Sequence, residues 1–248
     1  KGDFNVYRMF VETALAAIRA AQLGQACDGW RPWPTAPDAA SAALLPEDQA
    51  KAMLADHGVA VPRGVSAADL ARLQDSAGHL TAPLALKGLG FAHKTEAGAV
   101  RLNLSTLQDQ ADMAGAAGYL AEEMVTGALA EMLIGVRRDP VYGATLTLGF
   151  GGVTAELLAD TATLVLPVTA DEVGEALRSL RLWPLLDGYR GRARADVAAV
   201  VDVALALQAM LAADRLLQEI EINPLMVKAD GAVAADAGGK CADDTPIE

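Results

Sequence analysis

Cysteine and positive charge are scarce in this chain, and each shortage argues against a class of protein. The only two cysteines in 248 residues, Cys27 and Cys241, lie far apart without CxxC spacing. This favours free thiols in a reducing cytoplasm over a disulfide framework. The formal net charge is −12, which argues against a general nucleic-acid binder because such a protein needs a basic face. A nucleotide site stays open, since it needs only a few placed cations and backbone N–H groups.

Long uninterrupted apolar runs and aromatic residues are also missing. The longest apolar stretch, Val197 to Ala213, contains Asp202 and Gln208, which is typical of a buried amphipathic helix and not of a membrane span. Aromatic residues make up 4% of the chain and hydrophobic residues 52%, so Ala, Val and Leu must form most of the core. We expect a globular protein of one large or two small domains with no membrane partner.

The first part of the chain differs from the rest. An amphipathic pattern over residues 4–23 predicts a helix, and residues 28–40 hold three prolines and two tryptophans without periodicity. Such a segment is typical of a linker. We expect residues 1–43 to be the C-terminal helix of a missing upstream region plus a linker, and residues 44–248 to be the functional domain.

From residue 44 onward, helices and strands mix without the strict βαβ rhythm of a parallel sheet. The pattern predicts an α+β fold with mostly antiparallel strands. Helices are expected at about 46–57, 67–75, 107–117, 170–180 and 194–217, and strands at 84–89, 99–104, 119–125, 131–136, 144–148, 163–168, 218–223 and 232–236.

The sequence EIEINP at 219–224 carries the clearest chemical signal. Strand alternation places its two glutamates and Asn223 on one face and both isoleucines on the other. A turn predicted at 230–231 folds the chain back and brings Asp236 opposite Asn223. A carboxylate and an amide oxygen on paired strands suit Mg²⁺, which prefers oxygen ligands and keeps several waters. A hairpin with acidic residues on its wet face would have the same spacing.

Three other segments have weaker signals. An apolar strand brings Lys87 close to two glycines, where it can act as a point charge on a phosphate. His93 lies in a loop and can take up a phosphoryl group. Two strands predicted within 119–136 and their short polar linker can form a hinge that reads an adenine. A surface lysine, a hydrogen-bonded histidine and an ordinary strand pair are the alternatives.

In combination these segments resemble a known family. The lysine strand, HKTEAG, EMLIGVRRDP, GGVTAE, PLLDGYRG and EINPL with a final aspartate follow in this order between about Leu44 and Ala237. The order is similar to that of the ATP-grasp domain of NDP-forming acyl-CoA synthetases. This group includes ADP-forming acetate–CoA ligase and is related to the succinyl-CoA synthetase β subunit. The resemblance implies the ATP-grasp fold, in which two α+β subdomains sandwich the nucleotide.

The resemblance also implies how ATP or ADP is held. Lys87 would contact the nucleotide phosphates. Glu123 and Val125 would lie in the hinge around the adenine, and Glu131 would reach the ribose. None of these four roles follows from the local sequence alone.

The reaction implied by the resemblance is acid + CoA + ATP giving acyl-CoA + ADP + phosphate, through an acyl-phosphate and a phosphohistidine. Asn223 and Asp236 would hold Mg²⁺. Glu221 would meet and orient a phosphohistidine that arrives from elsewhere, and His93 would relay the phosphoryl group to the nucleotide. PLLDGYRG matches the family without suggesting a definite chemical role.

Several parts of such an enzyme are missing from these residues. The CoA-binding domain and the domain with the principal phosphohistidine would come from a partner subunit or from an upstream part of the same polypeptide. We expect a small carboxylic acid as substrate, an oligomeric assembly and a cytoplasmic location. Two alternatives stay open: an ATP-grasp ligase that joins a carboxylate to an amine, and a degenerate ATP-grasp domain that serves a protein acetyltransferase as a sensor or scaffold.

Overall fold

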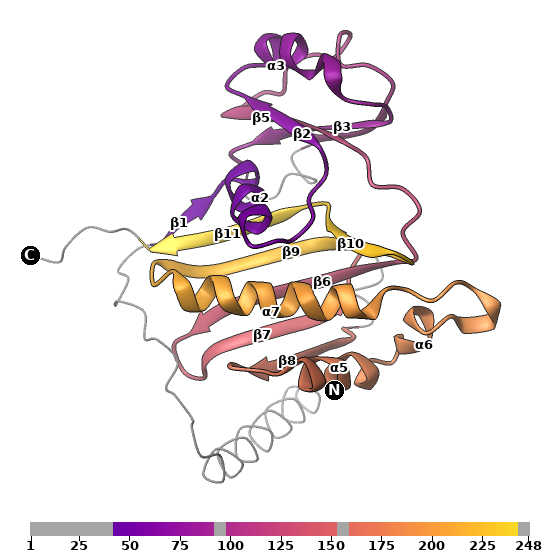
Figure 1. Ribbon diagram of the computed structural model, residues 1–248. Coiled ribbons are helices and arrows are strands. Elements are labelled where there is room, and N and C mark those ends of the chain that lie inside the picture. The colour runs from indigo at the N-terminus through magenta and orange to yellow at the C-terminus, as the bar shows by residue number, and fades with distance from the viewer. Residues whose placement is uncertain (1–41, 92–97, 153–158, 243–248) are drawn as a thin grey trace, which may run out of the picture.

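The computed structural model describes residues 42–91, 98–152 and 159–242, and Figure 1 shows their arrangement. The helix predicted over 4–23, the linker at 28–40 and His93 lie outside the described residues. Within the described ranges, no helix is long and apolar enough to cross a membrane.

A seven-stranded antiparallel sheet forms the larger part of the molecule. Its strands run in the order β1-β11-β9-β6-β7-β8, and β10 pairs with the remaining length of β9. The bounds are β1 (Ala42–Leu45), β6 (Ala130–Asp139), β7 (Gly143–Phe150), β8 (Thr161–Val165), β9 (Leu217–Lys228), β10 (Gly231–Ala234) and β11 (Ala237–Ala242). The domain boundary predicted after residue 43 thus falls inside a strand, since β1 pairs with β11 from Ala42 onward.

A second, four-stranded antiparallel sheet stands over one edge of the first (Figure 1). Its order is β2-β5-β3-β4, and its strands are β2 (Gly64–Ala67), β3 (Leu84–Leu89), β4 (Val100–Leu104) and β5 (Gly118–Glu123). Short helix α3 (Leu70–Ser76) packs against it and is followed by a 3₁₀ turn, Ala77–His79. Asp69 begins α3 by accepting a hydrogen bond from the Arg72 amide.

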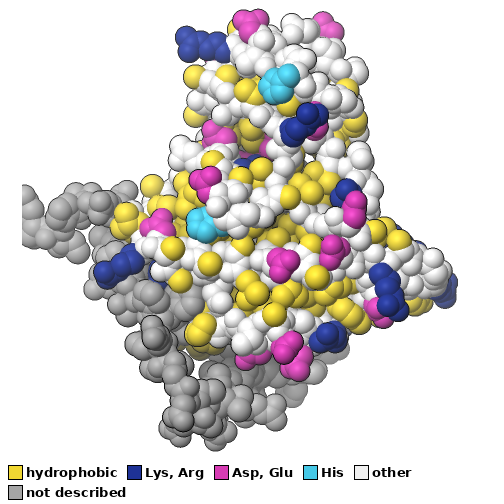
Figure 2. Space-filling view, in the orientation of Figure 1, with side chains coloured by type: hydrophobic (Ala, Val, Ile, Leu, Met, Phe, Trp, Pro, Cys, Tyr) yellow, Lys and Arg dark blue, Asp and Glu magenta, His cyan; other side chains and the backbone are white. Residues whose placement is uncertain are grey.

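Helices cover one face of the large sheet. The longest, α7 (Val197–Ala213), packs on β9 and β6, while α5 (Ala170–Ser179) packs on α7 and β8. In the sequence, the short α6 (Trp183–Leu186) and a 3₁₀ turn, Tyr189–Gly191, lie between α5 and α7. Figure 2 shows this side in space-filling form, with charged side chains dispersed among apolar ones.

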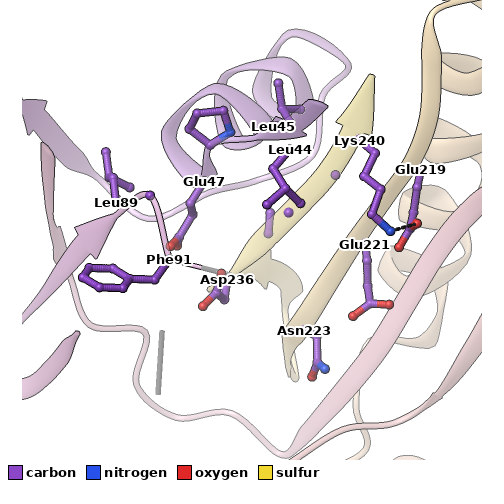
Figure 3. Close-up of a pocket in the computed structure, with 15 residues that line it drawn as sticks. Leu44, Leu45, Glu47, Leu89, Phe91, Glu219, Glu221, Asn223, Asp236 and Lys240 are labelled. Carbon is purple, nitrogen blue, oxygen red and sulfur yellow. Dashed lines mark hydrogen bonds and ion pairs between the residues drawn. The ribbon is translucent and has the colours of Figure 1, made fainter. Parts of the chain in front are cut away.

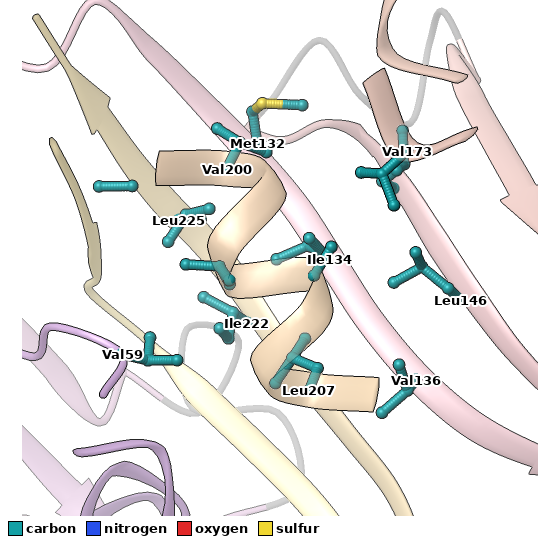
Figure 4. Close-up of a cluster of buried hydrophobic side chains, with 14 of the residues drawn as sticks. Val59, Met132, Ile134, Val136, Leu146, Val173, Val200, Leu207, Ile222 and Leu225 are labelled. Carbon is teal, nitrogen blue, oxygen red and sulfur yellow. The ribbon is translucent and has the colours of Figure 1, made fainter. Parts of the chain in front are cut away.

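The main core lies between α7 and the sheet. Ile134, Leu207 and Ile222 are completely buried there (Figure 4). Because Ile220 and Ile222 both point into this core, strand alternation directs the intervening Glu221 to the opposite face. The core therefore fixes which face of β9 carries the polar residues.

Helix α2 (Glu47–Asp56) connects the two sheets. Ala50 and Leu54 are fully buried in the core of the large sheet. Glu47 and Lys51, one turn apart, face the small sheet and are equally inaccessible to solvent. The α2 sequence thus presents an apolar side to one sheet and a charged side to the other.

The predicted α+β fold with antiparallel strands is confirmed, but two local predictions are wrong and one strand was missed. No helix forms at 107–117: the Gln74 side chain binds the carbonyl of Leu107 at 2.7 Å, and Gly115 has a φ of +86° that interrupts any helix. Strand β9 does not stop at Pro224 but continues to Lys228, and the strand after the turn is followed by β11, which the sequence did not indicate.

Candidate functional site

A cavity of about 670 Å³ lies where α2, the end of β3 and the β9–β11 pair meet (Figure 3). It is lined by Leu44, Leu45, Pro46, Glu47, Leu89, Gly90, Phe91, Glu219, Glu221, Asn223, Asp236, Ala237, Gly238, Gly239 and Lys240. The apolar residues come from β1 and from the end of β3, whereas β9 and β11 supply most of the polar ones. Both sheets therefore contribute to one concave site of the size that small-molecule ligands occupy.

Asn223 and Asp236 lie opposite each other on neighbouring stretches of chain in the wall of this cavity, as the sequence predicted. The Asn223 amide donates to the Asp236 carbonyl at 3.0 Å, and the next pair in register is Ile222 with Ala237. Both side chains line the cavity. One carboxylate and one amide carbonyl are hard oxygen donors that fit Mg²⁺ if waters and phosphate oxygens complete its shell. In the part of the chain that the structure describes, no group of three or more His, Cys, Asp or Glu side chains could hold a metal ion, so waters and phosphate oxygens would have to supply most of the ligands.

Glu221 lies beside this pair on the cavity side of β9 (Figure 3). Burial raises the pKa of Glu221, and the neighbouring Glu219 carboxylate raises it further. A hydrogen bond with Asn223 and the charge of Lys240 act in the opposite direction but do not cancel the increase. The Lys240 ammonium donates to Glu219 at 2.8 Å, so the cavity lining includes one positively charged side chain next to its carboxylates.

The raised pKa of Glu221 leads to a prediction about pH. Because the folded chain binds this proton more tightly than the unfolded chain, the ionised Glu221 opposes folding increasingly as pH rises above its ordinary value of 4.5. Glu221→Gln should therefore be more stable than the wild type at about pH 8 and lose this advantage as the pH falls toward 4.5. Thermal unfolding across this range measures the difference, with exposed Asp230→Asn as the control; a difference independent of pH would contradict the prediction.

The structure does not place Lys87 on the cavity surface. Its side chain is 6% exposed and its ammonium lies 2.5 Å from the Glu47 carboxylate and 3.0 Å from that of Glu122. Lys51 completes the group at 2.9 Å from Glu47 and 2.6 Å from Glu122. We call these four residues the buried charge cluster. Glu47 belongs to both the cluster and the cavity lining. Lys87, which contacts Glu47, therefore lies one side chain away from the cavity.

The two lysines of the cluster differ electrostatically. Burial alone would lower the pKa of Lys87, but Glu47, Glu122 and Asp236 together raise it above its ordinary value. Burial and the charge of Lys87 lower the pKa of Lys51 despite the same two glutamates. The raised pKa keeps Lys87 protonated, and the Asp236 carboxylate is close enough to contribute to this increase.

The residues predicted for the hinge lie on the segment that joins the small sheet to the large one. Glu123 ends β5, and its carboxylate is bound by Arg63 and by the Thr81 amide, which lower its pKa. Val125 is half-buried in the following linker, and Glu131 is exposed near the start of β6. None of the three is among the residues that line the cavity.

Hydrogen bonds restrict how this hinge can read a base. The amides of Glu123 and Met124 donate to the carbonyls of Arg63 and Pro83 at 2.9 and 2.8 Å. An adenine would have to be recognised by other atoms of the segment. The Glu131 carboxylate approaches Gly152, where an added Cβ would lie 2.8 Å from it, so a larger residue at 152 would crowd the predicted ribose contact.

Sequence reasoning missed four residues of this region: Glu47, Lys51, Glu122 and Lys240. The Glu47–Lys51 spacing of four on a predicted helix was a visible signal, because such residues lie on one helix face. Nothing local marked Glu122 as the partner, since adjacent Glu123 has the same chemistry and points elsewhere. Lys240 was hidden because β11 was not predicted.

Two antiparallel sheets with a cavity at their junction define a two-lobed α+β protein. A family model described as an ATP-grasp domain matches residues 38–238. The chain therefore belongs to the ATP-grasp domain family, which confirms the resemblance found in the sequence.

Curated proteins similar to this chain include acid–CoA ligases. The chain is 27% identical over 208 residues to the β subunit of ADP-forming acetate–CoA ligase I from Pyrococcus furiosus, which covers 78% of this chain and 90% of that one. It is 32% identical over 213 residues to a trans-feruloyl-CoA synthase of an unknown prokaryotic organism, of which it spans only 30%. The chain is thus similar to the ATP-grasp portion of larger ligases.

A solved structure confirms the fold. The dinucleotide-forming acetyl-coenzyme A synthetase 1 of Ca. Korarchaeum cryptofilum, in complex with coenzyme A and Ca-AMPCP, superposes with a TM-score of 0.71 at 23% identity. The match covers 81% of this chain and 93% of that chain.

Proposed function

We propose that this chain is the nucleotide-binding part of a cytoplasmic ADP-forming acid–CoA ligase. The observation that carries the proposal is the Asn223–Asp236 pair, which lies in register on β9 and at the start of β11 and lines the cavity beside Glu221. Membership of the ATP-grasp family and the similarity to ADP-forming ligases support it.

The residues of this chain have separate tasks in the proposed reaction. Asn223 and Asp236 would hold Mg²⁺, which supplies charge stabilisation to the phosphate oxygens. Lys87 would contact the phosphates after a shift of the cavity wall at Glu47. The segment from Glu123 to Glu131 would hold the nucleoside, and Glu221 would orient the imidazole of an incoming phosphohistidine.

The tasks that remain belong to partners. The β subunit from Pyrococcus is named as one subunit of a ligase, and the longer relatives carry additional chain. CoA, the acid and the principal phosphohistidine would therefore be bound by another subunit or by upstream domains. Relatives are named for acetate, ferulate and 4-hydroxybutyrate, so we propose a carboxylic acid whose identity is set outside this domain. We also propose an oligomeric assembly, and we place His93 in a phosphoryl relay.

Reconstitution tests the proposal. The chain is combined with a polypeptide that bears the CoA-binding and phosphohistidine domains, and ATP formation from ADP, phosphate and acetyl-CoA is measured. We expect activity only with both components. Glu221→Gln should lower turnover by about 100-fold, the order of loss caused by a misplaced reacting group, without changing ADP affinity.

The control variant is Glu219→Gln, on the same face of β9 but paired with Lys240; it should affect turnover far less. If the chain binds nucleotide but forms no ATP with any acyl-CoA tested, a carboxylate–amine ligase would be favoured. If it neither binds nucleotide nor forms ATP, the degenerate scaffold of a protein acetyltransferase would be favoured.

A further inference from the structure

The buried charge cluster joins parts of the chain that belong to different sheets. Glu47 and Lys51 come from α2, whose apolar side is embedded in the core of the large sheet. Lys87 comes from β3 and Glu122 from β5 of the small sheet. Each lysine contacts both glutamates at 2.5 to 3.0 Å. Two of the four pairs, Lys51–Glu122 and Lys87–Glu47, join α2 to the small sheet.

Both lysines also donate to one backbone atom. The Ala235 carbonyl accepts from Lys51 at 2.8 Å and from Lys87 at 2.7 Å. Ala235 lies in the short break between β10 and β11 and immediately precedes Asp236. Its amide donates to the Pro224 carbonyl at 3.0 Å, so the backbone is held on both sides at the point where the chain enters the proposed metal site.

Such a cluster adds little to the net stability of the fold and mainly determines how its parts are arranged. Removing four charges from water is costly, and a buried ion pair seldom stabilises a fold more than well-packed apolar residues would. Two cations and two anions in alternation give a neutral group in which each charge has oppositely charged neighbours. This favours one relative position of α2, β3 and the Ala235 carbonyl, because any displacement leaves a buried charge with a missing partner.

We propose that the buried charge cluster is a joint that fixes the small sheet against α2 and, through Lys51 and the Ala235 carbonyl, positions the Asp236 carboxylate for a divalent cation. Lys51 and Glu122 are positioning residues: neither is among the residues that line the cavity, and they act through Ala235 and Lys87. The cation-binding part of this inference rests on the proposed function. The mechanical part, that the cluster orders the β10–β11 junction, does not.

The test uses a variant that keeps the cluster neutral. Lys51→Met combined with Glu122→Gln removes one charge of each sign and leaves the Lys87–Glu47 pair, so the chain retains a balanced interior. The matched control makes the corresponding changes in the partly exposed pair of the β9–β10 turn, Lys228→Met with Asp230→Asn. Both are made in the 248-residue chain, and a similar melting temperature shows that each folds.

Two measurements are made on each variant. Hydrogen exchange reports the protection of the Asn223 and Ala235 amides, whose partners span the junction. Mn²⁺ titration in the presence of ADP, followed by electron paramagnetic resonance of protein-bound Mn²⁺, reports cation affinity when phosphate oxygens can complete the shell. In the cluster variant we expect at least tenfold faster exchange at these two amides and, by analogy with the loss of outer-shell partners, about tenfold or greater loss of Mn²⁺ affinity. The control variant should match the wild type.

The outcomes separate the two proposals. Unchanged exchange in the cluster variant overturns the joint, whatever the metal does. Faster exchange with unchanged Mn²⁺ affinity overturns the positioning of Asp236 while keeping the joint. If the wild type itself binds no Mn²⁺ even with ADP present, the proposed metal site and the positioning of Asp236 fail together, and the exchange result still decides the joint.

Discussion

Replacing Lys87 by Met is expected to lower the free energy of unfolding by about 3–5 kcal/mol, the usual loss when one partner of a buried ion pair is removed. The side chain is 6% exposed and neutralises Glu47 and Glu122 together with Lys51. Without it, two buried carboxylates share one lysine. Chemical denaturation of the wild type and the variant measures the difference. Lys228→Met, in a partly exposed ion pair, should cost less than about 1 kcal/mol.

A second change should restore most of that stability. Glu47→Gln in the Lys87→Met background leaves one lysine and one glutamate, so no buried charge remains unpaired. This double variant also separates folding from phosphate contact: we expect it to fold but to bind ADP about tenfold more weakly than the wild type, a loss of about one charge-assisted hydrogen bond. A Lys87→Met variant as stable as the wild type would contradict the structural role assigned to the cluster.

Replacing Asp236 by Ala is expected to have the largest effect on binding. Asp236 supplies the only carboxylate of the proposed Mg²⁺ ligand pair, and changes in outer-shell partners alone cost about 10–100-fold in metal affinity. We therefore expect a loss of about 100-fold or more in the Mg²⁺-dependent part of ADP affinity, while any Mg²⁺-independent binding is retained.

The matched control for this change lies on the same hairpin. Asp230→Ala alters an exposed aspartate at the β9–β10 turn, away from the cavity lining, and should bind MgADP as the wild type does. If both variants kept full Mg²⁺ dependence, the metal would be held elsewhere and the assignment of Asn223 and Asp236 would fail.

The hairpin around Asn223 shows how much of the site the sequence could predict. Alternation along β9 depends on a strict period of two, and the turn at 230–231 fixes the register, so the pairing with Asp236 followed from counting. The strand after it was invisible, because the Ala-Gly-Gly composition of β11 has little strand propensity. Lys240, which that strand brings to the cavity, could not be found.

The environment of Lys87 could not be predicted for a different reason. Its position at the end of an apolar strand was correct, since β3 spans Leu84–Leu89 as expected. Its partners, however, lie 40 and 35 residues away in sequence, on α2 and β5. The contact with Glu122 depends on which strands pair, and the contact with Glu47 depends on how α2 packs against the small sheet; local patterns encode neither. The helix predicted at 107–117 was lost similarly, to side-chain contacts from α3 and β5.

Calorimetric titration of ADP into the 248-residue wild-type chain, once with Mg²⁺ and once with a chelator, tests the nucleotide-binding assignment most directly. We predict binding with a 1:1 stoichiometry that is at least about tenfold tighter with Mg²⁺, because the metal would link the phosphates to Asn223 and Asp236. Equal affinity in both conditions, or no binding in either, would contradict a magnesium-dependent nucleotide site in this cavity.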